Sequence, residues 1–196
     1  MSDRCTRGWT GLMPNRTDTA VAVAEQLHHE CSTLMELYRA KESFAADVPD
    51  IRLVSVPPPS PQLDTKDKLG CLHSALLGCQ SLLERAIDKE EEELGRENKG
   101  AYDKQRKTVK DRLSFLLNDT GELLKAVDGG STLTPNVQLE SQNSVFDLKT
   151  WVYQVYKEVD YWTKIAISTV QGLPTIITKE MARTTSSRNI RSTYMR

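Results

Sequence analysis

Residues 144–170 read SVFDLKTWVYQVYKEVDYWTKIAISTV and carry the clearest helical signal of the chain. Apolar side chains recur there at alternating spacings of four and three residues, which is the pattern of one buried face of a long α-helix. The positions of this seam are Leu148, Val152, Val155, Val159, Trp162 and Ala166. Ser144 is the predicted N-cap, because a short hydroxyl side chain at that position accepts a hydrogen bond from an unpaired amide of the first turn. The stretch therefore predicts an amphipathic helix over residues 144–171.

Phe146 does not belong to this seam. At about 100° per residue it lies nearly opposite Leu148, on the same side as Lys149 and Tyr153. A large aromatic ring on the solvent face beside a cation indicates a contact with another molecule, although an off-seam Phe near a helix end is often covered by a loop of its own chain. Trp151 lies about 60° from Leu148 and is predicted to be mainly core, with some reach toward this site. The candidate site is therefore Phe146 and Lys149, with Trp151 and Tyr153 at its edge.

Three further helices are predicted from the same alternation, over residues 19–44, 65–94 and 101–127. Asp18 or Thr17 is the predicted N-cap of the first, and the acidic run Glu90–Glu93 is predicted to be a solvated end of the second. Residues 1–18 and 172–196 are predicted to be flexible segments flanking one domain, 19–171. The three seams are Ala20, Ala24, Leu27, Cys31, Leu34 and Tyr38; Leu69, Leu72, Leu76, Cys79, Leu83 and Ala86; and Tyr102, Val109, Leu113, Leu116, Leu123 and Val127.

The lengths of the connections predict how the helices are joined. A helix of about 25 residues is roughly 38 Å long, so a connection that returns along the whole bundle needs at least ~12 extended residues. The first and third connections are long and contain prolines, whereas the second, residues 95–100, is short and bounded by glycines. A long, short, long order predicts an all-α, long-chain four-helix bundle of the up-up-down-down type with two long crossover loops.

The last helix also resembles a known family. Its pattern is similar to the fourth helix of the interleukin-6 type helical cytokines, in the branch of ciliary neurotrophic factor and leukaemia inhibitory factor. The matching positions are Phe146-x-x-Lys149-x-Trp151, then Glu158, then Trp162-Thr163. Two motifs near the amino terminus, Leu12-x-Pro14-x-Arg16-x-Asp18 and Leu34-x-Glu36-x-Tyr38, are similar to the same branch, with a gap between them. The helices over 65–94 and 101–127 match only in general pattern.

The resemblance implies a neurotrophic cytokine or growth factor that assembles a cell-surface receptor, starts JAK/STAT signalling and supports neuronal survival or differentiation. It implies three partners: the ciliary neurotrophic factor receptor alpha, the leukaemia inhibitory factor receptor, and a shared signal-transducing chain on the face of the first and third helices. Receptor contact by the leukaemia inhibitory factor receptor falls on Phe146 and Lys149. The family's basic positions late in the fourth helix are replaced here by Lys164-Ile165-Ala166-Ile167-Ser168, which leaves the alpha receptor open. A homodimer is compatible with this interpretation and not required by it.

Composition bears on compartment and partners. A net charge of −1 gives no electrostatic case for nucleic acid or anionic lipid, and no segment is long and apolar enough for membrane insertion. No signal peptide is recognised at the amino terminus, so the expected location is the cytoplasm, with action outside the cell after unconventional release. Cys5, Cys31, Cys71 and Cys79 are expected to be thiols in a reducing compartment, and the sequons at Asn15 and Asn118 are expected to be unmodified.

Other function classes fit less well. Glu25 and His28 have the Glu-x-x-His spacing of di-iron bundles, but a second copy is missing, and His29 and Cys31 would need metal ligands from elsewhere. No catalytic residues, cofactor or metal are therefore expected, and a ferritin-like enzyme is the most distant alternative. The nearer alternatives are a sister cytokine of the leukaemia inhibitory factor or cardiotrophin type, and an intracellular helical adaptor.

Overall fold

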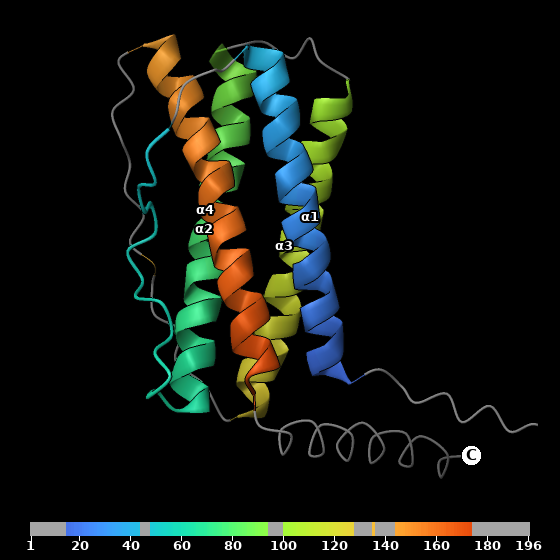
Figure 1. The fold of residues 1–196 in the computed structure, drawn as a ribbon, viewed down its shortest axis with the longest axis vertical. Helices are drawn as coiled ribbons and strands as arrows, with labels where there is room; N and C mark the ends of the chain where they lie inside the picture. The colour runs from blue at the N-terminus through green and yellow to red at the C-terminus, as the bar shows by residue number, and fades with distance from the viewer. Residues whose placement is uncertain (1–14, 44–47, 94–99, 128–134, 136–143, 174–196) are drawn as a thin grey trace, which may run out of the picture.

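The described part of the chain is helical, with four long helices lying side by side (Figure 1). The computed structural model describes residues 15–43, 48–93, 100–127, 135 and 144–173. The helices are α1 (Arg16–Glu42), α2 (Thr65–Glu93), α3 (Ala101–Ala126) and α4 (Val145–Gln171), and the described residues contain no strand. The all-α, four-helix prediction is confirmed.

Helix α1 packs against α3 and α4, and α2 packs against the same two helices. The end of α1 lies beside the start of α4, because the Tyr38 hydroxyl donates to the carbonyl oxygen of Lys149 at 3.1 Å. The start of α1 lies beside the end of α3, where Arg16 and Glu122 form an ion pair at 3.6 Å. Every predicted seam position is buried except Val127, which is half-buried. The core is therefore made by the four apolar faces that the sequence pattern predicted.

The ends of the helices correct two predictions. Ser144 caps α4 as predicted, since its Oγ accepts a hydrogen bond from the Asp147 amide at 3.1 Å. Helix α1, in contrast, begins at Arg16 with Asn15 as its N-cap, so the capping role predicted for Thr17 or Asp18 is wrong. Residues 16–18 thus belong to the bundle, whereas the rest of the predicted flexible segments, 1–14 and 174–196, lies outside the described residues. Gly172 and Leu173 close α4 through backbone hydrogen bonds to its last turn.

The connection from α1 to α2 is fixed on α4 by a buried carboxylate. Glu158 Oε1 accepts hydrogen bonds from the Val54 amide at 3.2 Å and the Trp162 Nε1 at 2.9 Å, and the Arg52 guanidinium lies 3.5 Å from Oε2. On α2, a Cβ at Gly78 would lie only 3.1 Å from Val54. The same Cβ would lie 3.2 Å from Pro135 in the connection between α3 and α4, so Gly78 is where both long connections approach the bundle.

Candidate binding surface

The first turn of α4 presents two adjacent apolar side chains to solvent. Phe146 is 62% exposed and Val145 is also among the exposed large hydrophobic residues. Two hydrogen bonds hold the turn that carries them. Ser144 Oγ accepts one from the Asp147 amide and donates the other to the Asp147 carboxylate. Phe146 is therefore exposed on the first turn of a helix whose start is capped.

Lys149 lies one turn after Phe146 and is held by α1. Its Nζ lies 2.6 Å from Glu42 Oε2, and its backbone carbonyl accepts the hydrogen bond from Tyr38. Residues three apart are neighbours on a helix surface, so Lys149 lies beside the Phe146 position. We call Val145, Phe146 and Lys149 the Phe146 surface. Glu42 was not singled out in the sequence, because its partner lies on another helix.

Trp151 and Tyr153 are both buried. This confirms the prediction that Trp151 is mainly core, and it corrects the predicted place of Tyr153 at the edge of the Phe146 surface. Tyr153 stacks on Tyr38 of α1 with ring centroids 6.3 Å apart, and the Arg39 guanidinium lies 5.0 Å above the Tyr153 ring. The prediction assumed one narrow seam, whereas α4 packs against α1, α2 and the connection bonded to Glu158, which widens its buried face.

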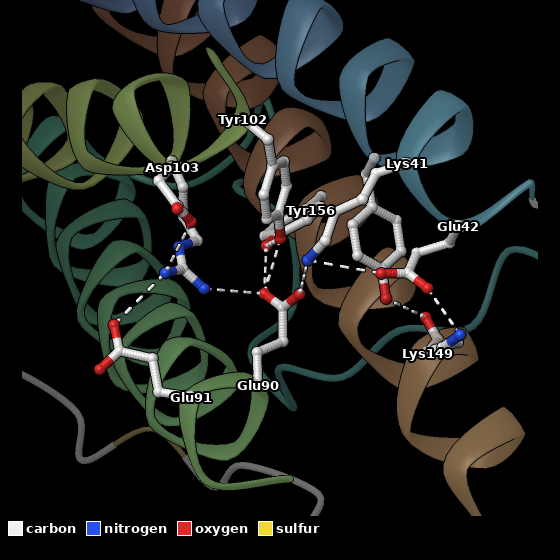
Figure 2. A network of polar contacts seen from close by, with 10 residues as sticks. Lys41, Glu42, Glu90, Glu91, Tyr102, Asp103, Lys149 and Tyr156 are labelled. Atoms are coloured by element: carbon white, nitrogen blue, oxygen red, sulfur yellow. Dashed lines mark hydrogen bonds and ion pairs between the residues drawn. The ribbon is translucent and has the colours of Figure 1, made fainter. Parts of the chain in front are cut away.

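The same end of the bundle contains a buried ionic centre around Glu90, a residue that was predicted to lie in solvent (Figure 2). Glu90 is only 2% exposed, so the prediction of a solvated end is wrong at this position. Its Oε2 accepts hydrogen bonds from Tyr102 at 2.6 Å and Tyr156 at 3.1 Å, and from Arg106 Nη1 at 3.1 Å. Burial raises the pKa of both tyrosine hydroxyls, which keeps them protonated as donors. Glu90 follows Ala86 at a spacing of four and so continues the buried seam of α2. This register was the one feature of the sequence that could have predicted its burial.

One lysine joins this centre to the Phe146 surface. Lys41 Nζ lies 3.4 Å from Glu42 Oε1 and 3.6 Å from Glu90 Oε1. Figure 2 shows Lys149, Glu42, Lys41 and Glu90 succeeding one another, with alternating charge. We call these four residues the charge chain. Each of its members has an oppositely charged neighbour within the protein.

A second exposed aromatic ring lies elsewhere on the bundle. Phe115 of α3 is 60% exposed and was not singled out in the sequence. It follows Arg112 by three residues, and the Arg112 guanidinium lies 3.9 Å from Glu30 of α1. Phe115 is thus on the outer surface of α3, toward α1.

A groove of about 450 Å³ lies between α1, α4 and the connection after α1. Its basic side chains are engaged by the protein itself. Lys157 donates to the Val48 carbonyl at 3.0 Å, Lys164 lies 2.8 Å from Asp160, and Arg52 lies 3.9 Å above the Tyr161 ring. The groove therefore has mixed, internally paired charge and favours no ionic ligand.

His28, which has the Glu-x-x-His spacing of a metal ligand, is engaged by Asp160, whose carboxylate lies 2.6 Å from His28 Nδ1. The pKa of the Cys31 thiol is raised, first by burial and then by the nearby Asp160 charge. Within the described ranges, no three His, Cys, Asp or Glu side chains are grouped as metal ligands would be. None of the four described helices combines the length and apolar character required to cross a membrane.

No protein-family model matches this sequence, and no match to a curated protein was found.

Proposed function

We propose that this protein is a neurotrophic cytokine of the interleukin-6 type, similar to ciliary neurotrophic factor, that acts by binding and not by catalysis. It acts outside the cell by bringing together the ciliary neurotrophic factor receptor alpha, the leukaemia inhibitory factor receptor and the shared signal-transducing chain. The approach of their cytoplasmic tails starts JAK/STAT signalling. The helices follow one another in the up-up-down-down order with two long crossover loops.

The observation that carries the proposal is the exposed Phe146 ring on the first turn of α4, with Lys149 one turn further on. An exposed aromatic residue on a rigid element is the type of side chain that dominates protein–protein binding energy. This is the pair that matches the family's contact with the leukaemia inhibitory factor receptor. The fold order is supported by the neighbours of α1, whose end lies beside the start of α4 and whose start lies beside the end of α3.

Phe115 supports a second contact. The family binds the shared signal-transducing chain on the face of its first and third helices, and Phe115 lies on the outer surface of α3 toward α1. Two exposed aromatic rings on different helices fit a ligand that engages two receptor chains at once.

The test is the substitution Phe146→Ala with Phe115→Ala as a matched control. Binding to the purified extracellular part of the leukaemia inhibitory factor receptor should fall more than tenfold for Phe146→Ala, since loss of an aromatic anchor costs at least ~2 kcal/mol. Phe115→Ala should leave this binding unchanged. Both variants should keep the helicity and melting temperature of the parent, because each ring is more than half exposed.

The cellular readout is STAT phosphorylation after purified protein is added to receptor-bearing cells. Phe146→Ala should abolish the response. Full activity of this variant, or a parent protein that binds none of the three receptor chains, would refute the proposal.

A further inference from the structure

We infer that His73 makes the contact between α2 and α3 sensitive to acid. Its neutral imidazole fastens α2 to α3, and protonation to the imidazolium loosens that contact between neutral and mildly acidic pH, the range in which histidine changes charge. His73 lies near the start of α2, whereas the Phe146 surface is joined through the charge chain to Glu90, near the end of α2. This device is therefore separate from the proposed receptor contact and does not depend on the proposed function.

The His73 ring lies directly against the backbone of α3. A Cβ at Gly121 would lie 3.2 Å from His73 Cε1 and 3.8 Å from each of the two ring nitrogens. The ring edge between the nitrogens thus faces Gly121, where the missing side chain allows the close approach. His73 itself is half-buried, so part of its ring is withdrawn from water by this contact.

Thr120 determines which ring nitrogen carries the proton. Its hydroxyl is fully buried and donates to the carbonyl oxygens of Leu116 at 2.9 Å and Leu117 at 3.1 Å, which uses its single proton. The same Oγ lies 3.1 Å from His73 Nδ1, so it accepts this hydrogen bond and Nδ1 is the donor. Neutral His73 therefore carries its proton on Nδ1, and a second proton must be added at Nε2.

The surroundings of the ring on α2 and α3 disfavour the imidazolium. Burial, followed by the positive charge of Lys125, lowers the pKa of His73 below 6.5. The nearest carboxylates of α3 in sequence, Asp119 and Glu122, both interact with Arg16 of α1, and Glu122 also pairs with Lys125 at 3.0 Å. The residues of α2 one turn before and after His73 are uncharged: Leu69, Gly70, Leu76 and Leu77.

Helix α4 also packs against α2, and the charged side chains of its second half are paired with other groups. The pairs are Lys157 with Asp50, Glu158 with Arg52, and Asp160 with both His28 and Lys164. The charge that protonation adds to His73 is therefore repelled by Lys125 and is only partly solvated.

The sign of the pH dependence follows from proton linkage. The folded protein binds this proton less tightly than the unfolded chain does, because the pKa of His73 is lowered on folding. His73 thus contributes its full stabilisation above about pH 6.5, and this contribution is lost as the pH falls. Carboxylates and the other histidines titrate as well, so the effect of His73 is the difference between the parent and a variant that lacks its imidazole.

The experiment compares the full-length parent with His73→Asn in urea unfolding at about pH 7.5 and about pH 5.0. Asparagine keeps an amide N–H near the position of Nδ1, so it can donate to Thr120, but it binds no proton in this range. His29→Asn is the matched control, because His29 is an exposed histidine of α1. Between the two pH values, the unfolding equilibrium constant should rise at least about threefold more in the parent than in His73→Asn. His29→Asn should follow the parent.

Two measurements on the ring and its surroundings accompany the unfolding data. Nitrogen NMR should show the Nδ1–H tautomer of His73 at neutral pH and protonation of this ring below pH 6.5. Hydrogen exchange at about pH 5.0 should show protection falling in residues 69–77 and 117–125 of the parent more than in His73→Asn. The same pH dependence of unfolding in the parent and His73→Asn would overturn the inference, and so would an Nε2–H tautomer. If His73→Asn does not fold, the NMR titration of the parent decides alone.

Discussion

Replacing Glu90 by alanine removes the common acceptor of three buried donors. The hydroxyls of Tyr102 and Tyr156 lose the carboxylate to which they donate, and the Arg106 side chain, 10% exposed, loses its most buried counter-charge. Breaking a buried ion pair by removing one partner costs about 3–5 kcal/mol. We expect a loss of about 3 kcal/mol, at the lower end, because Arg106 keeps two other carboxylates. For a chain of this size, that loss corresponds to a fall of roughly 6–12 °C in Tm.

Glu91 provides the matched control. It is the next residue on α2 and pairs with the same guanidinium at 3.3 Å, but its side chain is 37% exposed. Glu91→Ala should therefore cost at most about 1 kcal/mol. The stability of both variants is measured by urea unfolding followed by far-UV circular dichroism. If the free energy of unfolding falls with urea concentration at the same slope in both, their unfolding midpoints can be compared directly. If Glu90→Ala lost no more stability than Glu91→Ala, the buried ionic centre would not stabilise the fold and the argument would be refuted.

Three further outcomes are expected. Gly78→Leu should lose about 1–3 kcal/mol in urea unfolding, because even a Cβ there would lie 3.1 Å from Val54 and 3.2 Å from Pro135, so the leucine must displace both; parent-like stability would show that the two connections can shift to accommodate it. Ser144→Ala should lose about 1 kcal/mol and Ser144→Asp should not, since only alanine lacks an acceptor for the first-turn amide; equal losses would contradict the capping role. Burial raises three tyrosine pKa values above the ordinary 10.0, so stability is full below pH 10.0 and is lost as pH rises above it. The hydroxyls concerned belong to Tyr38, Tyr102 and Tyr156. Ultraviolet titration should show them ionising only together with unfolding, and ionisation in the folded protein would contradict the burial argument.

The four buried seams were predictable because each is a local property of one helix. A repeat such as Ala20, Ala24 and Leu27 fixes which side of the helix is apolar, and burying that side needs no knowledge of the partner. The start of α1 was predicted less well. Thr17 and Asp18 are good capping residues by type, but both fall within the first turn, and Asn15 occupies the N-cap position without a side-chain hydrogen bond.

Glu90 shows why a polar core position is harder to predict. Its register placed it on the buried side of α2, while its charge and acidic neighbours indicated solvent. The conflict is resolved by Tyr102 and Arg106 on α3 and by Tyr156 on α4, which supply the hydrogen bonds that a buried carboxylate requires. Those partners become neighbours only through the packing of whole helices.

The Phe146 surface was predictable in one part and not in another. The direction of Phe146 follows from helical periodicity alone, and the structure leaves that ring exposed. The pairing of Lys149 with Glu42 depends on how far α1 extends beside α4, which no local pattern specifies. Tyr153 was misplaced for the same reason, since α1 covers the side of α4 that periodicity assigned to solvent.

The charge chain links the buried ionic centre to the Phe146 surface, where we propose that a receptor binds. Glu42 is shared by Lys149 and Lys41, and Lys41 also reaches Glu90, so a change in the buried centre alters the electrostatic environment of the Phe146 surface without touching it. Residues linked through common partners do not act additively. A Glu90 variant that binds the proposed receptor more weakly, at a temperature well below its Tm, would therefore indicate coupling through Lys41 and Glu42. If adding Lys149→Met removed this loss, the effect would depend on the charge chain, and Glu90 itself would not be a contact of the proposed receptor.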